Sequence, residues 1–120
     1  MELNLDDDRL LDIPVSDATI TARILPLDEL VELGKKHTHI VMKGGVRTER
    51  LDSNEYSKEF WDRTIVSWQG ISRGGVPIPC NADTKFKTIM KFPEIADEIN
   101  AGIADAKAAT IEADKAAQKD

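Results

Sequence analysis

Few side chains in this sequence have the chemistry of a catalytic nucleophile or base. Cys80 is the single cysteine, and His37 and His39 are the two histidines, so these residues offer the one nucleophile and base pairing. A reactive cysteine needs neighbours that stabilise its thiolate. Cys80 instead lies between Pro79 and Asn81, and nothing in that sequence indicates such stabilisation. The sequence therefore predicts a protein that is not an enzyme and has no catalytic residues.

The same residues are the candidate metal ligands. Thr38 separates His37 from His39 in an H-x-H pair, and Cys80 would add a third ligand. The spacing matches no recurrent zinc pattern and leaves the fourth ligand undefined, so solvent-exposed loop histidines are the favoured interpretation. The acidic run at residues 6–8 lacks the glycine and the distal glutamate of a calcium loop, and we interpret it as a solvated segment. We expect no metal site and no cofactor.

Glycine pairs and tryptophans are the remaining features typical of ligand sites. The pairs at 44–45 and 74–75 are not followed by Lys-Ser/Thr or set in a GxGxxG frame, so they are interpreted as turns. Trp61 and Trp68 could stack on a base or another ligand. With Ile65 between them, however, their i, i+4, i+7 spacing is typical of the buried face of a helix. A core role is therefore favoured.

Length and charge describe one small acidic domain. The chain has 120 residues and a net charge of −6, which suits a single hydrophobic core. Acids exceed bases in residues 1–34 and 93–120, whereas bases exceed acids in residues 35–92. The bases of that middle segment are interleaved with acids and lack a nucleic-acid-reading motif, so nucleic-acid binding is not expected. A solvated mixed surface is the favoured interpretation, and head-to-tail self-association is the alternative.

Signals for export and for membrane insertion are missing from the sequence. The first residues lack a basic region followed by an apolar run, and one cysteine cannot form an internal disulfide. No window approaches the roughly 18 to 20 apolar residues that a membrane span needs. We expect a cytoplasmic protein.

The hydrophobic pattern predicts a single α+β domain, mostly helical with about four helices, and a small antiparallel sheet or hairpin near the N-terminal half. Residues 1–12 are expected to be a flexible acidic lead, residues 13–106 the domain, and residues 107–120 a tail rich in alanine and charge, either helical or frayed. Residues 13–25, broken by a turn signal at 16–17, predict two short strands or one bent strand.

A helix is predicted to begin at Pro26, with Leu27, Leu30 and Val31 on one face and Gly34 as its stop.

The middle of the chain carries further local signals. Residues 40–43 and 46–49 flank the glycine pair, which predicts a hairpin, with a flexible loop as the alternative. Asp52 caps a central helix over residues 53–69, ended by Gly70.

Two helices are predicted to follow an extended, proline-rich segment. Asn81 caps a helix with Phe86, Ile89 and Met90 on one side, and Pro93 opens a last helix.

The order of four short motifs resembles the small tail assembly chaperones of long-tailed phages and prophages. The motifs are LPLDEL at 25–30, DRTIVSWQGI at 62–71, GVPIPCN at 75–81 and FPEI at 92–95. In that family a helix ending in a W-x-G turn leads through G-x-P-x-P to a capped helix and then to a final helix. The resemblance covers roughly residues 18–106. The segment 40–50 is less typical of the family.

The resemblance implies a non-enzymatic protein of the bacterial host cytoplasm, absent from the mature virion. Such a protein binds the tape measure protein, keeps its apolar helices soluble and helps recruit tail tube subunits. Our candidates for the contact face are three isoleucines at spacing four and the acids beside them, Ile95, Ile99, Ile103, Glu94, Asp97 and Glu98. The alternative is that the isoleucines close the protein's own core, which is favoured for Ile95 and Ile99.

Two other functions stay open at this point. One is a structural tail or head-tail completion protein that is retained in the virion. The other is a small regulator that binds nucleic acid through the basic middle segment.

Overall fold

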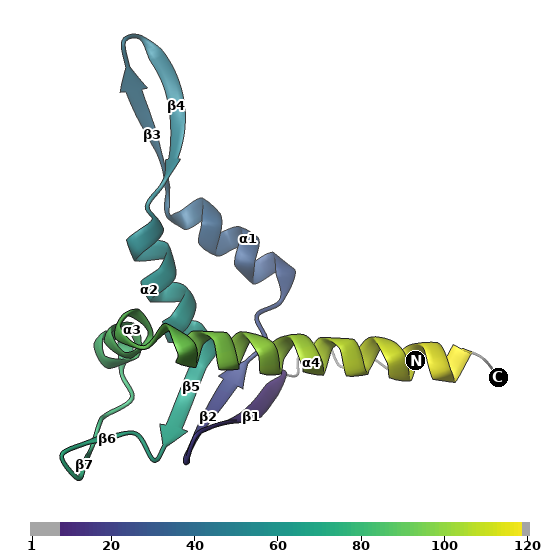
Figure 1. Ribbon diagram of the computed structural model, residues 1–120. Helices are drawn as coiled ribbons and strands as arrows, with labels where there is room; N and C mark the ends of the chain where they lie inside the picture. The colour runs from purple at the N-terminus through teal and green to yellow at the C-terminus, as the bar shows by residue number, and fades with distance from the viewer. Residues whose placement is uncertain (1–7, 119–120) are drawn as a thin grey trace.

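A three-stranded antiparallel sheet is the platform of the fold (Figure 1). The computed structural model describes the backbone of residues 8–118 and the side chains of residues 8–109. β1 (Leu10–Val15) pairs with β2 (Ala18–Arg23), and β2 pairs with β5 (Ile65–Gln69). Ser16 has a φ of 57° in the turn between β1 and β2, so the predicted pair of short strands is confirmed.

The N-terminal boundary lies earlier than predicted. β1 begins at Leu10, inside the segment 1–12 that was expected to be a flexible lead. Residues 1–7 of that lead lie outside the described residues, and their flexibility stays a prediction. Asp8 follows them, and its carboxylate lies 3.8 Å from the Arg23 guanidinium.

The helix predicted over residues 53–69 is wrong for its last five residues, which form a strand. The structure has α2 (Ser53–Thr64) followed directly by β5. In the ladder Ile65 lies opposite Ala22 while Ser67 lies opposite Thr21, so Val66 is an extra residue, as in a β-bulge. The bulge lets Ile65 and Trp68 both turn toward the core although they are three residues apart. A strand with a bulge thus reproduces the spacing of a helix.

The helices cover the sheet and enclose the core. α3 (Ala82–Lys91) packs beside α2, and α4 (Pro93–Gln118) crosses β1. The core cluster consists of seven buried side chains, Ile13, Ile20, Ala22, Trp61, Ile65, Ile89 and Ile99. Gly102 allows the close approach of α4, since a Cβ atom there would lie 3.0 Å from the Ile13 side chain.

α1 (Leu27–Lys36) presents a different face to the body than predicted. Leu33 is fully buried, whereas Leu27 and Val31 are exposed. α1 lies beside α2 (Figure 1), so only one narrow stripe of it is covered. Gly34 does not end the helix, which continues past it.

α3 begins at the predicted residue, but one side chain of its predicted buried face is exposed. The Asn81 Oδ1 accepts a hydrogen bond from the Thr84 backbone N–H, and the Thr84 hydroxyl accepts one from the Asn81 N–H, both at 3.1 Å. This is the capping-box arrangement. Ile89 is buried and Phe86 half-buried, but Met90 is exposed.

The predicted hairpin is confirmed and projects from the body (Figure 1). β3 (Thr38–Lys43) and β4 (Val46–Leu51) are joined by Gly44 and Gly45, whose φ angles are 59° and 79°. Two successive positive φ angles are the geometry of a type I′ hairpin turn. We call this element, residues 38–51, the hairpin arm.

α4 continues the fold away from the body in another direction (Figure 1). Its backbone is helical to Gln118, through most of the predicted tail at 107–120, whose last two residues lie outside the described part. The radius of gyration is 17.8 Å, against about 14 Å for a compact chain of this length. In residues 8–118 the chain has four helices and small antiparallel sheets, so the predicted α+β domain is confirmed.

Candidate functional site

The structure does not bring Cys80 together with the histidines. The His37 Nε2 atom lies 3.2 Å from the Glu59 Oε1 atom, whereas Cys80 packs against the core. Burial raises the pKa of the Cys80 thiol, which is partly opposed by the charge of Lys85. A raised pKa is the opposite of what an activated cysteine needs. Within the described residues no group of His, Cys, Asp and Glu side chains is arranged to hold a metal ion.

The two tryptophans have structural contacts. Trp61 is buried in the core, as predicted for it. Trp68 is half-buried on β5, and its indole Nε1–H donates a hydrogen bond to the Ile78 carbonyl oxygen at 2.8 Å.

The isoleucines proposed as a contact face lie against the protein's own sheet. Ile99 is fully buried, and Ile95 and Ile103 are partly buried and pack on the same core cluster. The acids beside them, Glu94, Asp97 and Glu98, are exposed. In this arrangement the stripe closes the core, so a partner would reach Ile99 only if α4 moved away from the sheet.

The hairpin arm carries the main exposed apolar surface. Its side chains Ile40, Val41, Met42, Val46 and Leu51 are 53, 38, 65, 63 and 45% exposed. These five belong to the twelve exposed large apolar residues in the described part of the chain, and no other element holds as many. A two-stranded hairpin has no core of its own and is at best marginally stable in isolation. Covering these side chains would therefore stabilise the arm.

The two faces of the hairpin arm differ in character. Residues directly opposite one another in an antiparallel pair point to the same face. One face carries Ile40, Met42 and Leu51 together with Thr38, Arg47 and Glu49, and we call it the apolar face after its three exposed apolar side chains. The other face pairs Val41 with Thr48 and Lys43 with Val46, and it adds His39 and Arg50. We call it the basic face, since its charged side chains are cationic.

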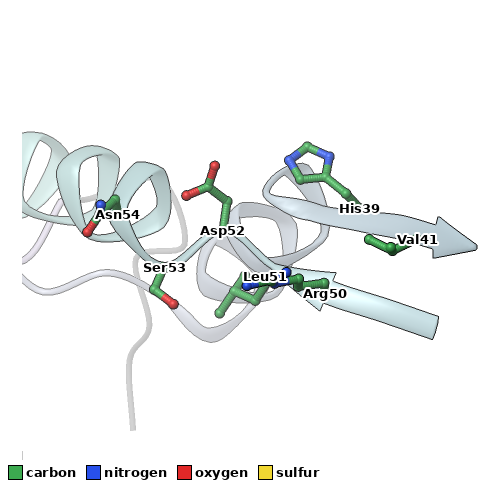
Figure 2. Close-up of a pocket in the computed structure, with 7 residues that line it drawn as sticks. All are labelled: His39, Val41, Arg50, Leu51, Asp52, Ser53 and Asn54. Carbon is green, nitrogen blue, oxygen red and sulfur yellow. The ribbon is translucent and has the colours of Figure 1, made fainter. Parts of the chain in front are cut away.

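A recess of about 480 Å³ lies where the basic face meets the start of α2 (Figure 2). It is lined by His39, Val41, Arg50, Leu51, Asp52, Ser53 and Asn54. Asp52 is committed to the fold, because its Oδ1 accepts a hydrogen bond from the Glu55 backbone N–H at 3.2 Å. The recess therefore offers a cation, a histidine and short polar side chains at the base of an apolar arm.

An ionic network fixes the base of the arm to the body. The Asp52 N–H donates to the His37 carbonyl oxygen at 2.8 Å and closes the hairpin. Glu59 of α2 then accepts from the Lys36 ammonium at 2.6 Å and also contacts His37 and Arg63. The Lys36 hydrogen bond is the main reason why the pKa of Glu59 is lowered.

The network continues from α2 to α1 and the sheet. The Arg23 guanidinium of β2 donates twice to the Glu29 carboxylate, at 2.6 and 2.8 Å, and Arg63 contacts the same carboxylate at 3.3 Å. The Arg23 bonds lower the pKa of Glu29. The Arg23 and Glu29 side chains are only 19% exposed, so these ion pairs are less screened by solvent than surface pairs.

The sequence analysis did not predict the exposed apolar surface of the hairpin arm, although the sequence contains a signal for it. Ile40, Val41 and Met42 are consecutive. Successive strand residues point to opposite faces, so a strand with one covered face cannot bury all three. Such a run in a hairpin indicates a surface that is covered on both sides or exposed to a partner.

Comparisons with known proteins identified no relative of this chain. A scan against protein-family models found no match, and searches of curated proteins and of solved structures found none. In residues 8–118 no helix has both the length and the apolar composition of a membrane span. The structure thus defines a small α+β protein with a projecting, two-faced hairpin.

Proposed function

We propose that this protein is a tail assembly chaperone of a long-tailed phage or prophage. It binds the tape measure protein in the bacterial cytoplasm, keeps it soluble and helps to recruit tail tube subunits. The observation that carries the proposal is the hairpin arm, whose apolar side chains are exposed on both faces and project away from the core. The motif resemblance supplies the identity of the partner.

The physical argument concerns the surface that a tape measure protein exposes. Its long helices present apolar stripes until the tail tube surrounds them, and exposed apolar surface drives aggregation. The apolar face of the arm, with Ile40, Met42 and Leu51, offers a cover for such a stripe. Laying an amphipathic helix on an apolar surface is a common mode of recognition.

The expected strength of this contact fits a factor that later leaves. Fully burying a large aliphatic side chain contributes about 1.5 to 3 kcal/mol, so the three half-exposed side chains of the apolar face contribute about 2 to 5 kcal/mol before association costs. Association itself costs about 4 kcal/mol or more. A single arm therefore gives weak, reversible binding.

The α4 stripe is a second candidate contact. Ile95, Ile99 and Ile103 become available only if α4 separates from β1 and exposes the core cluster. The exposed acids Glu94, Asp97 and Glu98 would then border the stripe and favour cationic partner segments.

Co-expression tests the proposal. The partner to use is the largest coiled-coil-like protein encoded just downstream of the gene, expressed alone and together with this chain. We expect the partner to move from the insoluble to the soluble fraction and to copurify with the chain. A partner that stays insoluble and unbound would contradict the proposal.

A structural component of the tail or of the head-tail junction is the second candidate. The flat, extended outline, 59 by 50 by 24 Å, suits lasting assembly with neighbours, and so do the two outer edges of the hairpin arm, which pair with no other strand in residues 8–118. Detection of the chain in purified particles would favour this function, because a chaperone leaves before the virion is complete.

A further inference from the structure

A second recess lies on the opposite side of the body from the hairpin arm. Its walls are α3 and the short hairpin formed by β6 (Ser72–Arg73) and β7 (Val76–Pro77), which Figure 1 shows below α3. The volume of the recess is about 620 Å³. We call it the α3 recess.

The lining of the α3 recess is cationic and partly apolar. Arg73, Lys87 and Lys91 supply three positive charges, and no acidic residue contributes to the lining. Ile78 and Phe92 supply the apolar part. A cationic recess in a chain of net charge −6 is a local reversal of the overall charge.

Two carboxylates at α3 are paired with other lysines. The Asp62 Oδ1 lies 3.1 Å from the Lys85 Nζ, and the Asp83 Oδ1 lies 3.0 Å from the Lys58 Nζ. In the described part of the chain, Arg73, Lys87 and Lys91 make no ion pair. Asp83 also interacts with the Lys87 charge without forming an ion pair, so all three cations can still contact a ligand.

The walls of the recess are fixed before any ligand arrives. The Trp68 indole holds the Ile78 carbonyl oxygen, and the Ile78 N–H donates to the Ile71 carbonyl oxygen at 2.9 Å. The capping box of Asn81 and Thr84 fixes the start of α3. A preformed site loses less conformational entropy on binding than a flexible one.

We propose that the α3 recess binds an acidic peptide segment that carries one apolar side chain. Carboxylates of the segment pair with Arg73, Lys87 and Lys91, and the apolar side chain lies against Ile78 and Phe92. The segment belongs to a partner protein, and the proposal does not depend on the hairpin arm or on the chaperone function.

A nucleic acid fits the recess less well. Binding to a phosphate backbone is driven by the number of phosphates that cations neutralise, and only three cations are present here. The net charge of −6 also repels a polyanion at longer range, more strongly than it repels a short peptide. Apolar lining by Ile78 favours an aliphatic side chain.

Fluorescence anisotropy with a labelled octapeptide of alternating aspartate and leucine tests the proposal. We expect saturable binding, and we expect the double substitution Lys87→Glu and Lys91→Glu to weaken it by about tenfold or more, because it replaces attraction by repulsion. Lys87→Gln with Lys91→Gln should weaken it less. The matched control is Lys43→Glu with Arg47→Glu on the hairpin arm, which changes the net charge equally and should leave the affinity within about twofold.

Three results would overturn the proposal. One is the absence of saturation up to about 1 mM peptide. Another is an equal loss of affinity in the control variant, which would show that only net charge matters. The last is equal or tighter binding of an aspartate–serine octapeptide or of a single-stranded oligonucleotide, which would indicate a general anion site or a nucleic-acid site.

Discussion

Trp68 and Ile78 are joined by a hydrogen bond of 2.8 Å from the indole Nε1–H to the backbone carbonyl oxygen. The bond links β5 to the segment that leads into α3, across the small β6–β7 hairpin. Trp68 also packs against the core cluster. One side chain therefore couples the sheet to a wall of the α3 recess.

Substitution of Trp68 tests this coupling. We expect Trp68→Ala to lower the free energy of unfolding by about 2 to 3 kcal/mol. Truncating a fully buried tryptophan typically costs about 3 to 5 kcal/mol, and the expected loss is smaller because Trp68 is half-buried. Trp68→Phe keeps most of the packing and loses the hydrogen bond, so about 1 kcal/mol is expected. Urea denaturation measures both, and a fully stable Trp68→Ala protein would show that Trp68 is only a surface residue.

The ion pair between α2 and α3 predicts an asymmetry. The Lys85 Nζ donates to the backbone carbonyl oxygen and to the carboxylate of Asp62, both at 3.1 Å. The Lys85 side chain is 9% exposed, whereas the Asp62 side chain is 44% exposed. Removing the carboxylate leaves a buried ammonium, while removing the ammonium leaves a carboxylate that water can reach.

We therefore expect Asp62→Ala to destabilise the fold by about 2 kcal/mol and Lys85→Met to change stability by less than about 1 kcal/mol. Thermal or urea unfolding of the two variants checks this order. A larger loss in Lys85→Met than in Asp62→Ala would mean that the pair itself, rather than the burial of the charge, stabilises the packing of the two helices.

The ionic network makes the stability of the fold depend on pH. Hydrogen bonds from Lys36 and Arg23 lower the pKa values of Glu59 and Glu29 below the ordinary value. A carboxyl with a lowered pKa in the folded protein stabilises the fold above its unfolded pKa, and this contribution is lost as the pH falls through the folded pKa. We expect the free energy of unfolding to decrease as the pH is lowered from about 4.5.

Urea denaturation as a function of pH measures this effect, with Glu59→Gln as the test variant. At pH 7 the variant should be less stable by about 1 to 3 kcal/mol, since it loses charged hydrogen bonds. Its free energy of unfolding should also fall less between pH 5 and pH 3 than that of the unaltered protein. This pH window spans the usual pKa range of carboxyl groups, about 3.5 to 4.5. Identical pH profiles would exclude a stabilising role for Glu59.

Local signals explain most of what the sequence predicted about the fold. Two glycines between apolar runs specify a type I′ turn, and Asn81 specifies the start of α3, because these choices depend on neighbouring residues only. β5 was missed because the bulge at Val66 gives Ile65 and Trp68 the spacing of a helix. Ladder register depends on the distant strand β2, which no local window contains.

The candidate site was less predictable, because its contacts also join residues that are distant in the sequence. The pairs Arg63–Glu29 and His37–Glu59 join residues more than twenty positions apart, so their sequence spacing carries no signal. The apolar run at residues 40–42 indicates an exposed surface, but only the assembled fold shows that these side chains stay exposed. Ile99 illustrates the converse, since its helical spacing indicated an apolar stripe without showing which surface covers it.

The hairpin arm is central to the proposed chaperone function, and one comparison tests it most directly. The downstream coiled-coil-like partner is co-expressed with the unaltered chain, with Ile40→Ser plus Met42→Ser, and with the control Leu27→Ser, which changes a side chain that is 76% exposed on α1. We predict that the soluble, copurifying partner is lost with the arm variant and kept with the control, while both variants keep the unfolding midpoint of the unaltered protein. Full solubilisation of the partner by the arm variant would contradict the assignment of the hairpin arm as the contact surface.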